Sequence, residues 1–212
     1  MNASKDVVRS SRETSFGTSG VSIVDRFGIW LSRRAILQQT RGRTNFDALE
    51  IGCGYDARNL VAIADHAASM TGVDFNLSPS LARLPSFRSI EGSFTEALPK
   101  FSDRQYDLIM IISVLEHLDD PISVLSTCRE MLRTNGLLLI NVPTWRGKVF
   151  LEYSAFRLKL SPKEEMDDHK MYYDKRDLWP TLVKSGFLPS DINMRYHKFG
   201  LNLFASASKG SN

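Results

Sequence analysis

Residues 48–55 read Ala-Leu-Glu-Ile-Gly-Cys-Gly-Tyr, a short apolar strand that runs directly into a glycine-rich turn. Glycine at positions 52 and 54 lets the backbone turn sharply and approach a ligand closely. The helix expected next, 57–66, presents its free N–H groups to an anionic group. Gly52-x-Gly54-x-x-Ala57 also matches the dinucleotide fingerprint G-x-G-x-x-A. The turn alone therefore predicts a nucleotide-binding α/β domain without deciding which nucleotide it binds.

Two carboxylates beside the turn narrow the choice of ligand. Glu50 comes two residues before Gly52, at the carboxyl end of the strand, where it is expected to point into the ligand crevice. A carboxylate there repels a pyrophosphate but attracts a ligand that carries an ammonium and a sulfonium group. Asp74 ends the next strand 20 residues after Gly54, where an acid accepts hydrogen bonds from the ribose hydroxyls. The two acids together indicate a positively charged adenosine derivative.

The rest of the chain alternates short apolar runs with helical stretches, which predicts a mainly parallel sheet covered on both faces. The expected strands are 48–51, 69–74, 88–91, 106–112 and 137–142, followed by an antiparallel hairpin of 191–198 and 201–207. The expected helices are 21–39, 57–66, 76–83 with Ser78 as cap, a helix from the Asp120 cap to Asn135-Gly136, and 175–185. Pro180 falls inside the last helix if Asp174 caps it, and in its first turn if Asp177 does.

The motifs, in this order, resemble those of the class I S-adenosylmethionine-dependent methyltransferases, in the small-molecule branch that includes the ubiquinone and menaquinone enzymes. The matching stretches are 49–54 for the first motif, 71–75 for the second, 106–109 with 113–118 for the fourth strand, and 132–139 for the approach to the fifth. The resemblance covers roughly residues 25–208. It implies a Rossmann-like, doubly wound sheet of seven strands with an antiparallel last strand and a helical lid. It also implies S-adenosylmethionine as cofactor.

The resemblance further implies which residues hold that cofactor. The candidates are Glu50, Gly52, Cys53, Gly54, Asp74, Phe75, Ser93, Phe94, Ser113 and Val114. Phe75 is expected to pack on the adenine. This chain departs from the family pattern at Ser93, where relatives commonly carry an acid for the adenine amino group, and at Tyr55-Asp56, where they often have small residues.

Methyl transfer from a sulfonium is an in-line displacement, and alignment of the acceptor can contribute roughly 7–11 kcal/mol. A general base is needed only if the acceptor must lose a proton. The candidate bases are His117, at the mouth of the crevice, and His169, in the aromatic-rich insert 145–174. His117 can equally serve to hold its loop. We expect the N-terminal helical segment 21–45 and the insert to close over the acceptor.

Bulk properties limit the alternatives. Cys53 and Cys128 are too few and too far apart for a disulfide framework or a zinc cluster, so no metal site is expected. No apolar run approaches the ~20 residues of a membrane span, and the first 20 residues lack a signal-peptide pattern. We therefore expect a cytoplasmic protein with a flexible segment at 1–20 and a methyltransferase domain at 21–212.

The acceptor is left open by the sequence, as are two other functions. Residues 1–45 hold eight Lys and Arg against three Asp and Glu, which favours nucleic acid only weakly. Against nucleic acid, Ser113-Val114-Leu115-Glu116 replaces the Asn-Pro-Pro-aromatic or Pro-Cys stretch of base-modifying relatives. A small molecule, a glycan or a lipid precursor is the expected acceptor. The alternatives are an NAD(P)-binding oxidoreductase, which Glu50 opposes, and a non-catalytic methyltransferase-like binding module; the oligomeric state is not indicated.

Overall fold

The computed structural model describes residues 23–101, 103–153 and 170–210. The predicted flexible segment 1–20 lies outside these residues, as does 154–169, which holds His169 and the middle of the predicted insert. In the described part of the chain, no helix is long and apolar enough to cross a bilayer.

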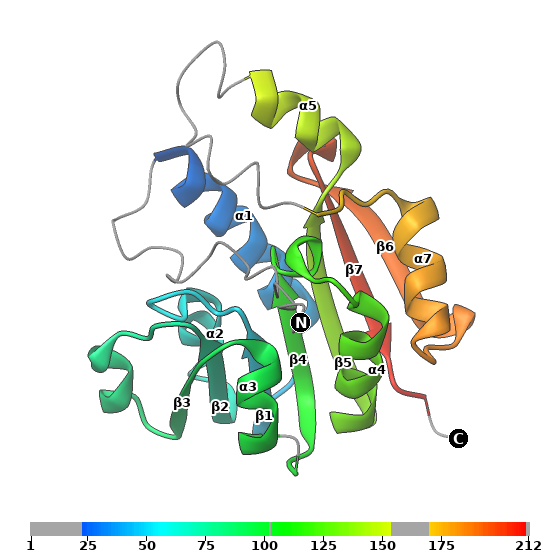
Figure 1. Ribbon diagram of the computed structural model, residues 1–212. Helices are drawn as coiled ribbons and strands as arrows, with labels where there is room; N and C mark the ends of the chain where they lie inside the picture. Colours follow the sequence, from blue (N-terminus) through cyan, green and yellow to red (C-terminus); the bar gives the residue numbers. More distant parts are fainter. Residues whose placement is uncertain (1–22, 102, 154–169, 211–212) are drawn as a thin grey trace, which may run out of the picture.

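Seven strands form one mixed sheet in the order β3-β2-β1-β4-β5-β7-β6 (Figure 1). They are β1 Phe46–Ile51, β2 Ala67–Asp74, β3 Phe87–Glu91, β4 Tyr106–Ile112, β5 Leu132–Pro143, β6 Ile192–His197 and β7 Asn202–Ser208. Strands β1 to β5 pair in parallel, and β7 is antiparallel to both β5 and β6. The predicted seven-stranded sheet with an antiparallel last strand is confirmed. This order differs from the 3-2-1-4-5-6 order of dinucleotide-binding sheets.

Helices cover both faces of the sheet because the central strands are apolar on both sides. Leu108 and Met110 of β4 pack in one core cluster with α1 (Ile23–Gln39) and α2 (Arg58–Ile63). Ile109 and Ile111 pack in the other cluster with α4 (Pro121–Met131) and α7 (Lys175–Lys184). Two further short helices are α3 (Phe94–Ala97) and α5 (Trp145–Tyr153).

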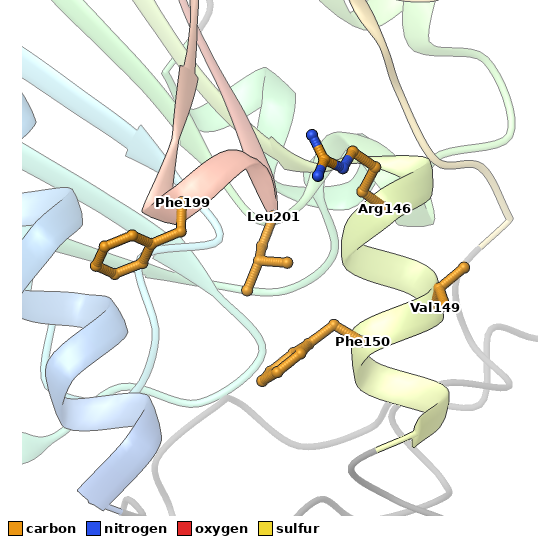
Figure 2. Close-up of a pocket in the computed structure, with 5 residues that line it drawn as sticks. All are labelled: Arg146, Val149, Phe150, Phe199 and Leu201. Carbon is orange, nitrogen blue, oxygen red and sulfur yellow. The ribbon is translucent and has the colours of Figure 1, made fainter.

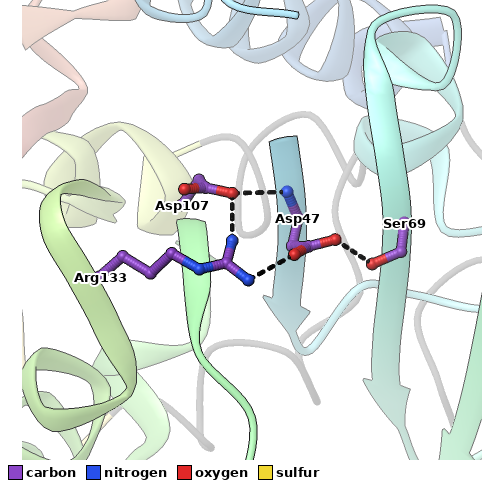
Figure 3. A network of polar contacts seen from close by, with 4 residues as sticks. All are labelled: Asp47, Ser69, Asp107 and Arg133. Atoms are coloured by element: carbon purple, nitrogen blue, oxygen red, sulfur yellow. Dashed lines mark hydrogen bonds and ion pairs between the residues drawn. The ribbon is translucent and has the colours of Figure 1, made fainter. Parts of the chain in front are cut away.

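A chain of polar contacts joins four strands at the edge of the sheet opposite the glycine turn (Figure 3). Arg133 on β5 binds Asp107 of β4 at 2.5 Å and Asp47 of β1 at 2.7 Å. Ser69 of β2 donates to Asp47 at 2.6 Å. Burial alone would raise the pKa of Asp47, but the bonds from Ser69 and Arg133 hold it below its ordinary value. We call these four residues the aspartate clasp.

Several element boundaries differ from the prediction. Ala57 has a φ of +44°, so α2 begins only at Arg58, because a left-handed residue cannot be part of an α-helix. The predicted helix 76–83 is a 3₁₀-helix over Pro79–Arg83, and Ser78 caps it as expected by accepting from Ser80 N. The helix capped by Asp120 ends at Met131, not at Asn135-Gly136; Asn135, with a φ of +64°, forms a bend inside β5.

The structure also decides between the two alternatives for the last helix. α7 begins at Lys175, and the side chain of Asp177 accepts a hydrogen bond from Asp174 N at 2.8 Å. Asp174 therefore caps the helix, and Pro180 lies in its interior.

Candidate active site

The glycine turn lies at the carboxyl edge of the sheet, between β1 and α2. The N–H groups of Gly52 and Cys53 donate to the carbonyl of Val73 at 2.8 and 3.2 Å, which fixes the turn to the end of β2. Gly52 and Gly54 have φ values of +70° and +73°, which glycine adopts without strain. The predicted turn thus forms, and its backbone is anchored rather than loose.

Gly52 also lies against the loop that follows β4. A Cβ atom added at Gly52 would stand 2.2 Å from Cγ2 of Val114, so no side chain fits there. The neighbouring Ser113 has a φ of +57°, and its N–H donates to the carbonyl of Asn141 at 2.8 Å. The structure therefore brings the predicted residues of the first and fourth strands together at one place.

Asp74 lies where the sequence places it, beside the glycine turn. Its carboxylate accepts hydrogen bonds from Gly54 N at 2.7 Å and from Phe75 N at 2.8 Å. These bonds fix the orientation of the carboxylate at the end of β2. Phe75, next to it, is exposed.

Glu50 is more enclosed than its expected position in a crevice suggests, because its side chain is fully buried. Its Oε1 accepts from Nδ2 of Asn59 at 2.6 Å, while Oε2 has no hydrogen-bond partner among the described residues. Burial raises the pKa of Glu50 to about 8; the Asn59 bond lowers it and the nearby Asp74 raises it. Sequence reasoning missed Asn59, although a polar residue in the first turn after a glycine loop is a usable signal.

Cys53 and Ser93 have local structural roles in addition to their predicted place near the cofactor. Burial raises the pKa of the Cys53 thiol well above its ordinary value, which disfavours the nucleophilic thiolate form. The Ser93 hydroxyl caps α3: it accepts from Glu96 N at 3.3 Å and donates to the Glu96 carboxylate at 2.9 Å. Phe94, in the first turn of α3, packs against Phe101 with ring centroids 6.0 Å apart.

His117 ends a 3₁₀-turn, Leu115–His117, directly after the β4 loop and is half-buried. The carbonyl of Glu116, before it, accepts from the N–H groups of Lys170 and Met171 at 2.9 and 3.3 Å. The end of the predicted insert is therefore tied to the loop that holds His117. His169 itself lies outside the described residues.

Two features of β5 and α5 were not identified from the sequence. Asn141 is fully buried at the level where β4 ends, and neither its Oδ1 nor its Nδ2 has a hydrogen-bond partner in the part of the chain that the structure describes. Trp145 and Tyr172 pack with ring centroids 5.6 Å apart at the end of β5, and Nζ of Lys148 stands 5.7 and 5.6 Å from these two rings. The many aromatic residues of the insert indicated an aromatic surface of this kind, but nothing in the sequence indicated that Lys148 would lie beside it.

A family model described as a methyltransferase domain matches residues 25–188. The chain belongs to this methyltransferase family. The ubiquinone biosynthesis O-methyltransferase of Histophilus somni is 28% identical over 190 residues, which are 82% of this chain and 79% of that enzyme. The Pasteurella multocida protein of the same name is 28% identical over 158 residues, 66% of this chain. The methyltransferase spans 63% of that second relative, less than two thirds of its length.

Solved structures share the fold of the methyltransferase. A SAM-dependent methyltransferase from Archaeoglobus fulgidus has a TM-score of 0.58 at 16% identity, over 89% of this chain and 100% of that one. The YcgJ protein of Bacillus subtilis has a TM-score of 0.63 at 13% identity, over 85% of this chain and 99% of that one. The expected class I fold and small-molecule branch are thus confirmed, and S-adenosylmethionine is the cofactor.

The described residues fit this cofactor. The buried Oε2 of Glu50, which has no partner among the described residues, would be available to the ammonium group, and Asp74 would be available to the ribose hydroxyls. In the turn between them, Gly52 has no room for a side chain because Val114 lies against it. When bound, S-adenosylmethionine supplies a methyl group that is already activated for displacement.

Proposed function

We propose that the methyltransferase methylates a hydroxyl oxygen on the ring of a small aromatic acceptor, as in O-methylation of quinone precursors. The observation that carries the proposal is the Trp145–Tyr172 pair with the Lys148 ammonium beside both rings. Aromatic side chains bind flat rings by stacking, and an ammonium group stabilises a phenolate. The names of the curated relatives, which are O-methyltransferases of ubiquinone biosynthesis, support the same acceptor class.

In this reaction each of the named residues has a separate role. Glu50 and Asp74 hold the donor, and the loop of Ser113 and Val114 packs against the turn that cradles it. The acceptor oxygen is aligned behind the methyl group, so the O–CH₃ bond forms as the S–CH₃ bond breaks. The hydroxyl proton passes to His117 or His169, and Lys148 stabilises the negative charge that develops on the oxygen.

The proposal narrows the predicted acceptor classes of small molecule, glycan and lipid precursor to the first. It is tested with methyl-labelled S-adenosylmethionine and a panel of catechols, monohydroxybenzoates, sugars and primary amines. We expect label on the catechols or hydroxybenzoates. Label only on sugars or amines would contradict the proposal.

A matched pair of variants tests the role of the cation. Lys148→Met should reduce kcat for a phenolic acceptor by about 10- to 100-fold, since one charge-assisted interaction is worth ~1.5–3 kcal/mol. It should leave the calorimetric affinity for S-adenosylmethionine unchanged. Lys184→Met, on the exposed side of α7, serves as control and should change neither quantity.

A further inference from the structure

A groove of about 440 Å³ lies between α5 and the turn that joins β6 to β7 (Figure 2). Its lining side chains are Arg146, Val149, Phe150, Phe199 and Leu201. Phe199 is 86% exposed, Val149 65% and Phe150 48%. Large apolar side chains gathered at this level of exposure mark an interaction surface.

The fold holds this surface rigidly. Lys198 and Phe199 both have left-handed backbones, with φ values of +49° and +60°, a conformation that persists only where surrounding contacts enforce it. Thr144 provides such contacts: its Oγ1 donates to the carbonyl of Gly200 at 2.8 Å and its N–H to that of Leu201 at 3.0 Å. The outward position of Phe199 is therefore a built feature of the turn.

α5 is packed closely against the same turn. A Cβ atom added at Gly147 would stand 2.2 Å from the carbonyl oxygen of Leu201, so only glycine allows this approach. The two walls of the groove are thus held together at its base.

Basic residues outnumber acidic ones in the segments that form this surface, since α1, α5 and residues 195–201 together hold seven Lys and Arg against the two acids Asp25 and Glu152. α1 is adjacent to the turn, because Nζ of Lys198 stands 3.7 Å from the place of a Cβ atom on Gly28. α1 also carries the stacked and exposed pair Phe27 and Trp30.

We propose that α1, α5 and the 198–201 turn dock the methyltransferase on an anionic lipid surface. Exposed aromatic side chains surrounded by Lys and Arg, with long stems that follow the apolar groups, match the interfacial layer of a bilayer. A second copy of the chain fits less well, since a two-fold interface would place like charges against one another. The turn and the start of α5 lie at the carboxyl edge of the sheet, so docking places the active-site edge at the lipid surface (Figure 1).

The test is co-sedimentation of the full chain with phosphatidylcholine vesicles, with and without phosphatidylglycerol. We expect binding to the anionic vesicles that weakens as salt is raised, and little binding to phosphatidylcholine alone. Phe199→Asn should reduce the bound fraction several-fold, as should Arg146→Gln combined with Lys198→Gln. Asparagine tolerates positive φ, so the turn should still fold. Leu188→Asn removes an exposed apolar residue outside the patch, 51% exposed against 86% for Phe199, and serves as control.

Three results would overturn the proposal. One is that the wild-type chain binds no anionic vesicles at low salt, and another is that it binds them equally well with Phe199→Asn. The third is that Phe199→Asn dissociates a dimer in sedimentation velocity while vesicles are not bound, which would assign the surface to a second copy. None of these measurements uses the acceptor, so they are independent of the proposed reaction.

Discussion

Glu50 and Asn59 are joined by a hydrogen bond of 2.6 Å beneath the glycine turn, and solvent does not reach the carboxyl group of Glu50. Burial makes the charged form of Glu50 unfavourable and raises its pKa to about 8. Without a ligand, Glu50 is therefore mostly a neutral acid at pH 7. A cation bound beside it would favour loss of the proton, so we expect donor binding and ionisation of Glu50 to be coupled.

The first prediction concerns stability against pH. The pKa of Glu50 is about 8 in the folded protein against 4.5 as the ordinary value, so the folded state binds its proton more tightly. Its contribution to the free energy of unfolding is complete below about pH 4.5 and is lost as the pH rises through about 8. Glu50→Gln should remove this decline, as measured by urea unfolding at several pH values in that window. Identical pH profiles of the two proteins would contradict the assignment.

The same coupling predicts that donor binding releases a proton. Calorimetric titration with S-adenosylmethionine at pH 7, in buffers of different ionisation enthalpy, should show release of close to one proton. Glu50→Gln should release none and bind at least about 10-fold more weakly, because a charge-assisted bond is lost. Binding without proton release in the wild-type chain would mean that Glu50 does not face the ammonium group.

Asp74→Ala should weaken binding of S-adenosylmethionine and S-adenosylhomocysteine by about 10- to 100-fold, since each hydrogen bond to a charged group is worth ~1.5–3 kcal/mol. Part of this loss of affinity is expected because Asp74→Ala also removes the hydrogen bond that the Asp74 carboxylate accepts from Gly54 N at 2.7 Å. Asp74→Asn keeps an acceptor oxygen for that N–H and should lose less. Asp65→Ala, at an exposed acid after α2, is the control. An unchanged affinity in Asp74→Ala would refute the ribose assignment.

Gly52 and Gly42 form a matched pair for a test of the turn. Both have positive φ, +70° and +80°, but a Cβ atom at Gly42 meets nothing within 4 Å while one at Gly52 meets Val114 at 2.2 Å. Gly42→Ala should therefore cost only ~1 kcal/mol of backbone strain. Gly52→Ala should cost an additional ~1–3 kcal/mol of overpacking and abolish donor binding. Equal destabilisation in chemical unfolding would mean that the two loops do not touch.

Asn141→Leu should stabilise the fold by about 1 kcal/mol or more, because the buried amide makes no hydrogen bond with the described residues and leucine is similar in shape. The measurement is the urea midpoint, with Asn193→Leu on the exposed side of β6 as control. A rise in stability together with a loss of methyl transfer would show that the amide serves the reaction. A drop in stability would mean that the amide is paired, for instance with water.

The fold was predictable because apolar runs of strand length alternate with helical stretches. Residues that typically begin helices also stand where helices begin: the side chain of Asp120 accepts a hydrogen bond from Ser123 N at 3.0 Å, as expected of an N-cap. What failed were boundaries set by backbone angles. Nothing in the residue type of Ala57 indicates a φ of +44°, which arises from the tight turn in which its N–H donates to Gly54 O at 3.1 Å.

The candidate site was predictable where the residues that shape the fold are also the residues expected to bind the ligand. Gly52, Gly54 and Asp74 meet because parallel strands end at one edge. Partners that depend on tertiary packing were not predictable. Asn59 meets Glu50 only because α2 folds back over β1, and Asn141 is identifiable only once both faces of β5 are known to be covered. The roles of His117 and His169 stay predictions.

The aspartate clasp lets the protein accept sequence changes at the opposite end of the sheet. Ser69, Asp47, Asp107 and Arg133 link four adjacent strands at the end remote from the donor and the groove. Substitutions that reshape α5 or the 198–201 turn therefore leave the cross-strand contacts of the core intact. Recombination libraries that exchange α5 should consequently yield a high proportion of folded members that keep the donor site and differ in the acceptor they take.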